Sequence, residues 1–477
     1  MVYGKGHPEG WLMRVVFSHL GKNGGEEMKK VKIVLIGVGS IFFGQSVLAD
    51  LMASRELKEL DLTISLVDID KAALDRMYRF AGLLKKYHDV KAKIEATTNL
   101  ENALPEANYV IVSVEKRRKR LWDQDFYIPF AFGFRQGRAE TGGPGAAFHA
   151  LRSLHLVIPI CRAMEKLCPD ALLINYTNPE NRVALGVIKL TRIRCVGLCD
   201  GYTDTLREVA RILGKSEKDI DINIGGINHF HWVLQMHSRP DEKNLYPQFN
   251  QRMVQSDWGL HPLVQRMYEI FGLFPFPAFT HLAEFVSFAY EICGPDYLNR
   301  WNNVIGPSSK KEESVIPVKY DKYITDKYIL GEQLQRVVKN KEPLTKELAY
   351  PTEVELGVPI ICDIEFNRNR KELSVNVLNE KLAISNLPED AVVEISARVD
   401  AQGIHPIKVG PLPEAIAAMC RIQISIQKLI IEAYQERSKK LLLQALLIDP
   451  MIDSIDRTEK MMEELLKIEI NFLPAFR

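Results

Sequence analysis

The sequence has almost no net charge and no long hydrophobic run. Its 477 residues include 62 lysines and arginines and 61 aspartates and glutamates, giving a net charge of +1. This balance provides no electrostatic basis for binding nucleic acid or an anionic membrane. No uninterrupted apolar stretch reaches the ~18 residues of a membrane-spanning helix. The composition, 46% apolar and 26% charged, is typical of a globular protein, and the length predicts two or three domains.

Paired-cysteine motifs are also missing. The seven cysteines are odd in number and scattered, which argues against a disulfide framework and predicts a reducing, cytoplasmic location. The chain contains no C-x-x-C or H-x-x-x-H spacing, no internal repeat and no low-complexity segment. Residues 1–27 combine polar and glycine-rich pieces with an apolar patch too interrupted for a signal peptide. We expect them to form a disordered extension without function.

What the sequence does contain is a strand–glycine turn–helix pattern near its start. The apolar run Ile33–Ile36 predicts a buried parallel strand, and a helical pattern begins near Gln45. Between them lie Gly37, Gly39 and Ser40, at a point where a glycine backbone can approach a dinucleotide pyrophosphate. The third glycine of the usual fingerprint is absent, so a phosphate-free turn with glycines for steric reasons is the alternative.

Alternating patterns continue to about Gly201. The stretch Asp61–Asp70 predicts a second strand and carries Asp68 near its end, where an acidic side chain can bind an adenosine ribose. Further strands are expected at Lys91–Ala96, Tyr109–Val114, Ala171–Tyr176 and Arg194–Leu198, with helices at Lys71–His88 and Asn99–Ala103. This alternation of strands and helices predicts a doubly wound parallel sheet.

Helical patterns dominate after about Val233. The expected helices are Pro262–Phe271, His281–Ile292, Lys327–Lys339, Leu412–Leu443 and Ile455–Glu469. Short strands of a smaller mixed sheet are expected at Cys362–Asp363, Leu373–Leu378 and Ala391–Val399. We therefore expect a helix-rich second domain.

Three polar clusters stand out after or within apolar stretches: Thr177–Asn181, Cys199–Tyr202 and Gly225–His231. Ligands of open α/β sheets bind at the carboxyl ends of strands, which makes these clusters site candidates. An Asn-Pro turn, a small buried cysteine and a core histidine are the structural alternatives. A cysteine with a histidine suits Zn, Mn, Fe or Co. On a strand His229 and His231 would share one face, and only one of them need be a ligand.

A glycine-rich loop, Arg135–Arg152, runs into a helical pattern and carries Arg135, Arg138 and Glu140. Such loops often form one wall of a polar substrate pocket, and a solvated surface loop is the alternative. Arg135, Arg138 and His149 would favour a substrate with an anionic group, although arginine also binds neutral hydroxyls.

The combination of these motifs resembles glycoside hydrolase family 4, the NAD- and metal-dependent glycosidases. The resemblance covers Lys30 to about Pro450 and rests on Gly37–Ser40, Asn175–Asn181, Cys199-Asp200, Gly226–His229 and Gly403–Pro406. It implies a Rossmann domain at 28–201, like that of lactate and malate dehydrogenases. A second, mixed α/β domain at 202–477 would provide substrate, metal and oligomer contacts.

The resemblance also implies roles for individual residues. Cys199 and His229 would bind a divalent metal, usually Mn²⁺, and Asp200 beside the cysteine would act as the acid. The general base is sought among His281, Glu284 and Tyr290. The candidate site residues are thus Asp200, Tyr290 and Glu284 for catalysis; Gly37, Gly39, Ser40, Asp68 and Asn178 for the cofactor; and Asn178, Glu140, Arg138 and His281 for substrate.

The implied activity is hydrolysis of an α-glycoside or a uronide. Its steps are NAD-dependent oxidation at C3, metal-assisted deprotonation at C2 and elimination, a scheme outside the two-carboxylate mechanism of most glycosidases. An NAD-dependent hydroxy-acid dehydrogenase of the lactate or malate type is the alternative enzyme, and an NAD-binding regulatory or structural protein is the alternative without catalysis. The expected partner is a small carbohydrate, and the expected assembly is a homodimer or homotetramer.

Overall fold

The computed structural model describes residues 28–477 except 41–42, 200, 294–321 and 351–355. The extension expected at 1–27 and the proposed acid Asp200 therefore lie outside the described residues. None of the described helices combines the length and the apolar character that a membrane crossing needs.

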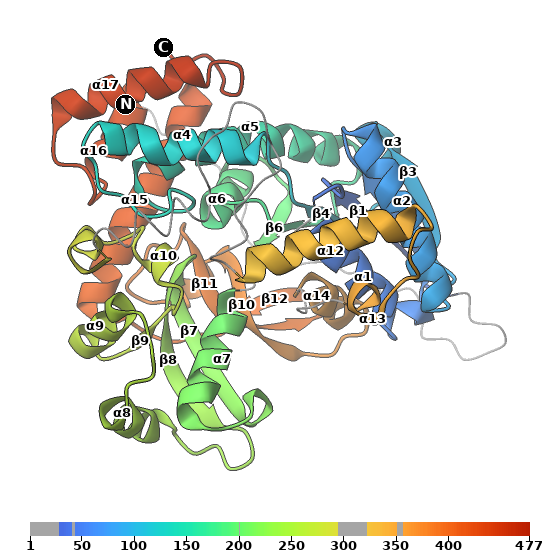
Figure 1. Cartoon of the computed structure of the whole chain (residues 1–477), viewed down its shortest axis with the longest axis horizontal. Helices are drawn as coiled ribbons and strands as arrows, with labels where there is room; N and C mark the ends of the chain where they lie inside the picture. The colour runs from blue at the N-terminus through green and yellow to red at the C-terminus, as the bar shows by residue number, and fades with distance from the viewer. Residues whose placement is uncertain (1–27, 41–42, 200, 294–321, 351–355) are drawn as a thin grey trace.

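Within the described residues, strands join into one 12-stranded sheet (Figure 1). The strands are β1 (Lys30–Ile36), β2 (Asp61–Val67), β3 (Lys93–Thr97), β4 (Tyr109–Val112), β5 (Leu172–Asn175), β6 (Arg194–Gly197), β7 (Ile220–Ile227), β8 (Phe230–Ser238), β9 (Phe274–Pro275), β10 (Arg370–Leu378), β11 (Val392–Asp400) and β12 (Gly403–Pro406). Their order is β3-β2-β1-β4-β5-β6-β10-β11-β7-β8-β9, and β12 pairs with β11.

The first six strands form the predicted parallel half. Strands β1, β2, β3, β4, β5 and β6 pair in parallel with their neighbours. The order β3-β2-β1-β4-β5-β6 is that of the doubly wound dinucleotide-binding fold, which confirms the predicted fold class.

From β6 onward the pairing becomes antiparallel. Strand β6 pairs with β10, which pairs with β11, and β11 pairs with β7. The domain boundary predicted near residue 201 thus follows β6, the last strand of the parallel half, in a sheet that is continuous. That 28–201 and 202–477 act as separate domains stays a prediction.

Helices cover both faces of the sheet. They are α1 (Gly44–Ala53), α2 (Lys71–Tyr87), α3 (Leu100–Ala103), α4 (Arg118–Ala131), α5 (Gly143–Leu167), α6 (Glu180–Leu190), α7 (Gly201–Leu213), α8 (Tyr246–Gln255), α9 (Pro262–Phe271), α10 (Phe279–Leu282), α12 (Lys322–Val338), α13 (Lys346–Ala349), α14 (Gly357–Glu365), α15 (Glu414–Glu436), α16 (Lys439–Leu447) and α17 (Ile455–Ile468).

Strand β1 illustrates how the two faces are formed. Alternate side chains of a strand point to opposite faces, so Ile33 and Leu35 join one apolar core while Val34 and Ile36 join the other. The second core also contains buried side chains of α5, α6, α15, α16 and α17. The last two of these helices, α16 and α17, lie beside α4 and α5 in Figure 1. Burial on both faces explains why the parallel strands are apolar throughout.

Three elements differ from those expected. Cys362–Asp363 lies in α14 and not in a strand, because a short apolar run does not distinguish a buried strand from a buried helix. The helix expected at His281–Ile292 is broken after Leu282, and the one expected at Leu412–Leu443 is broken at Arg437, whose φ is +58°. Strands β10 and β11 confirm the strands expected at Leu373–Leu378 and Ala391–Val399, but they extend the one continuous sheet, and β9 and β12 were not expected.

Candidate active site

The predicted dinucleotide turn joins β1 to α1. Gly37 has a φ of +82°, and a Cβ there would lie 2.0 Å from the carbonyl oxygen of Ser113, so the position needs glycine. The Gly39 N–H donates to Asp68 Oδ2 over 2.8 Å, and Ser40 Oγ accepts from the Phe43 N–H over 3.3 Å. The acidic residue predicted from spacing is therefore held against the turn that it was expected to complete.

The donor set of this turn fits a dinucleotide. The residue before helix α1, Phe43, makes no side-chain cap bond to the helix, and the first turn holds no acidic residue. In this fold the N-terminus of such a helix binds the pyrophosphate and the acidic residue after the second strand binds the ribose, so α1 and Asp68 are the parts that would hold the dinucleotide.

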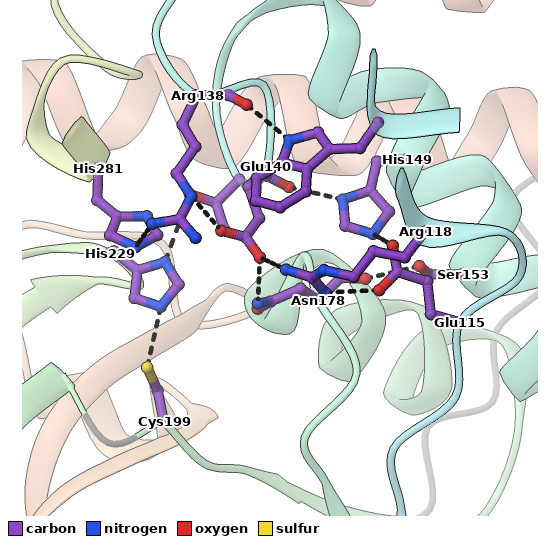
Figure 2. Close-up of polar contacts among 12 residues, drawn as sticks. Glu115, Arg118, Arg138, Glu140, His149, Ser153, Asn178, Cys199, His229 and His281 are labelled. Carbon is purple, nitrogen blue, oxygen red and sulfur yellow. Dashed lines mark hydrogen bonds and ion pairs between the residues drawn. The ribbon is translucent and has the colours of Figure 1, made fainter. Parts of the chain in front are cut away.

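The predicted metal ligands meet at the same edge of the sheet. Cys199 follows β6, and His229 lies in the two-residue connection between β7 and β8. Figure 2 shows the thiol pointing at the imidazole, with Cys199 Sγ 2.9 Å from His229 Nε2. Two such atoms bound to one tetrahedral ion stand about 3.5 Å apart, so a small widening of the pair admits a cation. A soft thiolate with a borderline imidazole also suits the metals expected here.

His229 is buried and neutral. Its ring lies 4.3 Å from that of His281 and 5.8 Å from that of Phe276 between centroids. Burial, with the neighbouring His281 adding to it, lowers the pKa of His229 to about 3. A neutral imidazole is the form that binds metal.

The second histidine of the motif has a different role. His231 Nδ1 lies 2.9 Å from Glu394 Oε2 and His231 Nε2 lies 2.9 Å from Thr205 Oγ1, while Ser374 Oγ donates to the other oxygen of Glu394. Both ring nitrogens of His231 are thereby engaged in the core. Of the two histidines, His229 is the one that the described contacts place against the Cys199 thiol.

Glu140 is the centre of a charged cluster beside this pair. Its carboxylate accepts from Arg118 over 2.8 Å and from the side-chain amide of Asn178 over 3.1 Å, and it forms an ion pair with Arg138 Nε at 2.9 Å (Figure 2). Burial would raise the pKa of Glu140, but the two guanidinium groups outweigh it and hold the pKa well below its ordinary value. Glu140 is therefore a carboxylate, and the cluster joins the predicted substrate residues Glu140, Arg138 and Asn178.

His281 connects the cluster to the metal pair. Its Nε2 lies 3.2 Å from a guanidinium nitrogen of Arg138, and its ring packs on His229. Asn178, at the carboxyl end of β5, is fixed by its carbonyl oxygen, which accepts from Ser153 Oγ over 2.6 Å. These contacts bring together four segments that lie far apart in the sequence.

The other two general-base candidates, Glu284 and Tyr290, are placed differently from His281. Glu284 is completely buried, and its carboxylate accepts from the backbone N–H groups of Glu140 and Thr141. The Tyr290 ring packs under the guanidinium of Arg135, with 5.4 Å between the Arg135 Cζ and the ring centroid. The catalytic roles of Glu284, Tyr290 and Asp200 stay predictions.

Sequence reasoning missed three residues of the cluster. Arg118 and Glu115, which pair over 2.5 Å, belong to a basic run that resembles a solvated surface. Thr141 follows Glu140 directly, and its Oγ1 lies 3.4 Å from His229 Nδ1. In the sequence, only its position next to Glu140 could have indicated that Thr141 belongs to the site. Nothing in the sequence indicated Glu115.

The fold and the site together define a dinucleotide-binding α/β protein with a thiol–imidazole pair at the carboxyl edge of its sheet. Comparison with known proteins gives the particular family. Residues 32–215 match the model of the family 4 glycosyl hydrolases, and residues 224–452 match the model of their C-terminal domain. The chain belongs to the family 4 glycosyl hydrolases and is a glycosidase, which excludes the dehydrogenase alternative.

Individual relatives agree with this assignment. An α-galactosidase of Bacillus subtilis is 29% identical over 94% of this chain and 100% of its own length. An α-glucosidase of Erwinia rhapontici is 27% identical over 88% of this chain and 93% of its own. The fold is shared with a solved 6-phospho-α-glucosidase from gut microorganisms in complex with NAD and Mn²⁺, at a TM-score of 0.76 and 21% identity over 94% and 100% of the two chains.

Proposed function

We propose that this glycosidase uses NAD and Mn²⁺ to hydrolyse a neutral α-hexopyranoside of the galactoside or glucoside type. The observation that carries the proposal is the 2.9 Å approach of Cys199 Sγ to His229 Nε2 beside Asn178 and Glu140. The solved relative complexed with NAD and Mn²⁺ and the α-glycosidase names of the curated relatives support the cofactors and the anomer.

The absent groups would supply redox and Lewis-acid chemistry. NAD bound at Gly37, Gly39, Ser40 and Asp68 would accept a hydride from sugar C3 and return it, and a metal held by Cys199 and His229 would polarise the adjacent sugar oxygens. The chain itself orients the sugar. The amide of Asn178 and the carboxylate of Glu140 form one polar surface, in which Glu140 accepts hydrogen bonds.

Proton transfer is assigned to two further residues. We assign Asp200, adjacent to Cys199, as the acid that protonates the leaving oxygen, and Tyr290 as the base that removes the C2 proton. Asp200→Asn and Tyr290→Phe should each lower kcat by about 100-fold or more while leaving Mn²⁺ affinity unchanged.

Charge balance favours a neutral sugar over a uronate or a phosphate. Arg138 is paired with Glu140, and Arg118 is shared between Glu140 and Glu115. Burial, with Arg152 adding to it, lowers the pKa of His149 to about 3, so His149 is uncharged. Anion recognition needs a cation that is not already neutralised, and Arg118, Arg138 and His149 do not offer one. The remaining candidate, Arg135, is exposed and packs on the rings of Phe130 and Tyr290, outside the Glu140 cluster.

The test is a panel of 4-nitrophenyl glycosides with NAD⁺, Mn²⁺ and a thiol reductant. α-Galactoside or α-glucoside should be cleaved at least about tenfold faster than α-galacturonide or the 6-phosphorylated sugars. Reaction in D₂O should place deuterium at C2 of the released sugar, since the C2–H bond breaks and a solvent proton returns. Cleavage without NAD⁺ and in excess chelator would refute the proposed function, and preferential cleavage of the galacturonide would refute the neutral sugar.

We also propose that the protein works as a homodimer or homotetramer in the reducing cytoplasm. All seven cysteines are free thiols, which supports a reducing location. The C-terminal helical region exposes the large apolar side chains of Ile422, Ile448, Ile455 and Ile470, which supports an interface there. Size-exclusion chromatography with light scattering would give the molar mass of the assembly, and the mass of a monomer would refute the proposed oligomer.

A further inference from the structure

The contacts of Glu284 combine the backbone and the side chain of one residue. Glu284 follows α10 and is completely buried. One of its oxygens accepts from the Thr141 hydroxyl over 2.5 Å, and both lie within 3.3 Å of the Thr141 nitrogen. The neighbouring Glu140 N–H also donates to Glu284, over 2.5 Å. The carboxylate therefore fixes Thr141 at two points.

These contacts decide the direction of the next hydrogen bond. Burial raises the pKa of Glu284 to about 7, so above that pH the group is a carboxylate that only accepts, and the hydroxyl proton of Thr141 is then committed to Glu284. The same hydroxyl oxygen lies 3.4 Å from His229 Nδ1, and with its proton already donated it acts there as an acceptor. His229 consequently carries its proton on Nδ1.

The opposite ring nitrogen is then the free base. His229 Nε2, which faces Cys199 Sγ at 2.9 Å, presents a lone pair to the position between the two side chains. Metal-binding imidazoles owe their tautomer and orientation to such a hydrogen bond on the other nitrogen, and loss of the partner typically lowers metal affinity 10–100-fold.

We infer that Thr141 and Glu284 form a relay that orients His229 as a metal ligand, with Thr141 and Glu284 acting as positioning residues. The inference rests on the proposed function, because it assumes that Cys199 and His229 hold the cation. Glu284 also holds the backbone of Glu140, so one buried carboxylate connects the substrate cluster to the metal ligand. This position assigns Glu284 to positioning, while proton removal is left to Tyr290.

The test compares Mn²⁺ binding by the NAD-loaded wild type and by three threonine variants. Binding is measured from the electron paramagnetic resonance signal of free Mn²⁺. Thr141→Val removes the hydroxyl at nearly constant volume and should weaken Mn²⁺ binding 10–100-fold. Thr141→Ser keeps the hydroxyl and should remain within about threefold of the wild type. The matched control is Thr458→Val on α17, where another fully buried hydroxyl bonds to the Ser454 carbonyl.

Mn²⁺ affinity of Thr141→Val within about threefold of the wild type would overturn the relay alone. No Mn²⁺ binding by the wild type would overturn the proposed function and the relay with it. A second measurement needs no folded variant of Thr141: ¹⁵N NMR of histidine-labelled, metal-free wild type, with the His229 signals identified from His229→Gln. The relay requires a proton on His229 Nδ1 and none on Nε2, and the reverse pattern or a doubly protonated ring would overturn it.

Discussion

At the scale of single residues, the site depends on two side chains that are 30 positions apart and meet at 2.9 Å. The first prediction concerns this pair. Cys199→Ser and His229→Gln should each abolish measurable Mn²⁺ binding and lower kcat/KM by about 1000-fold or more, because two ligands cannot be reduced to one without loss of the ion.

The control for this prediction is another cysteine of the same stretch. Burial raises the pKa of the Cys195 thiol well above its ordinary value, so it is a poor nucleophile and ligand. Cys195→Ser should retain Mn²⁺ binding. Mn²⁺ should also protect Cys199, and not Cys195, from alkylation by iodoacetamide, as mass spectrometry of the peptides would show. Full activity of Cys199→Ser would contradict the assignment.

Asp68 is the second residue that can be tested alone. Its Oδ2 accepts from the Gly39 N–H and its Oδ1 accepts from the Asp70 N–H. Asp68→Ala removes both the support of the turn and the acceptor for the ribose, so the Kd for NAD, measured by calorimetry, should rise about tenfold. An unchanged Kd would place the cofactor elsewhere.

At the scale of elements, the neighbouring Asp70 provides a contrast to Asp68. Asp70 caps α2, and its carboxylate accepts from the N–H groups of Ala72 and Ala73. Asp70→Ala should therefore lower the free energy of unfolding by about 1 kcal/mol while leaving the Kd for NAD unchanged. Urea denaturation and calorimetry on the same samples separate the two effects. A tenfold loss of NAD affinity in Asp70→Ala would show that the cap also serves the cofactor.

Strand β10 and helix α14 bring two buried carboxyl groups together, Glu372 and Asp363. Burial, with Asp363 adding to it, raises the pKa of Glu372 to about 8 from an ordinary 4.5. The native state then holds a proton that the unfolded state has released, so the free energy of unfolding should fall as pH rises from about 4.5 to about 8. Glu372→Gln should flatten this fall and make the protein more stable at pH 8, by about 1–3 kcal/mol.

Urea denaturation at pH 5, 6, 7 and 8 measures this dependence. Glu459→Gln, at an exposed position of α17, serves as the control and should follow the wild type. A parallel fall of stability in Glu372→Gln and the wild type would contradict the assignment to Glu372.

At the scale of the whole molecule, a buried arginine ties the C-terminal helix to the wall of the site. Arg152 on α5 donates to Asp125 on α4 over 2.5 and 2.9 Å, and to Glu469 after α17 over 2.7 Å. Asp125 and Glu469 are completely buried. Removal of the arginine would leave two carboxylates unpaired in the core, a change that typically costs several kcal/mol.

Arg152→Leu should accordingly lower the free energy of unfolding by about 3–5 kcal/mol, measured by urea denaturation. The matched control is Arg162→Leu on the same helix, where the exposed arginine pairs with Glu165 and should contribute at most about 1 kcal/mol. Equal effects of the two substitutions would mean that the Arg152 pairs add nothing specific to the core.

The sequence by itself determined the strands of the parallel half, the glycine turn at Gly37 and the polar residues that follow β5 and β6. These features depend on neighbours in the chain, through side-chain periodicity and turn chemistry, so local patterns record them. A short apolar run is too short to show a periodicity, and for this reason Cys362–Asp363 was predicted as a strand and proved to be helical.

Only the tertiary structure decided which polar residues act together. It separated His229 from His231, paired Glu140 with Arg118, and brought Glu284 to Thr141 from 143 positions along the chain. The strand order that puts β7 beyond β10 and β11 brings the β7–β8 turn to the edge where Cys199 follows β6. Contacts between such distant segments depend on how the sheet is assembled, and no local pattern of residues encodes them.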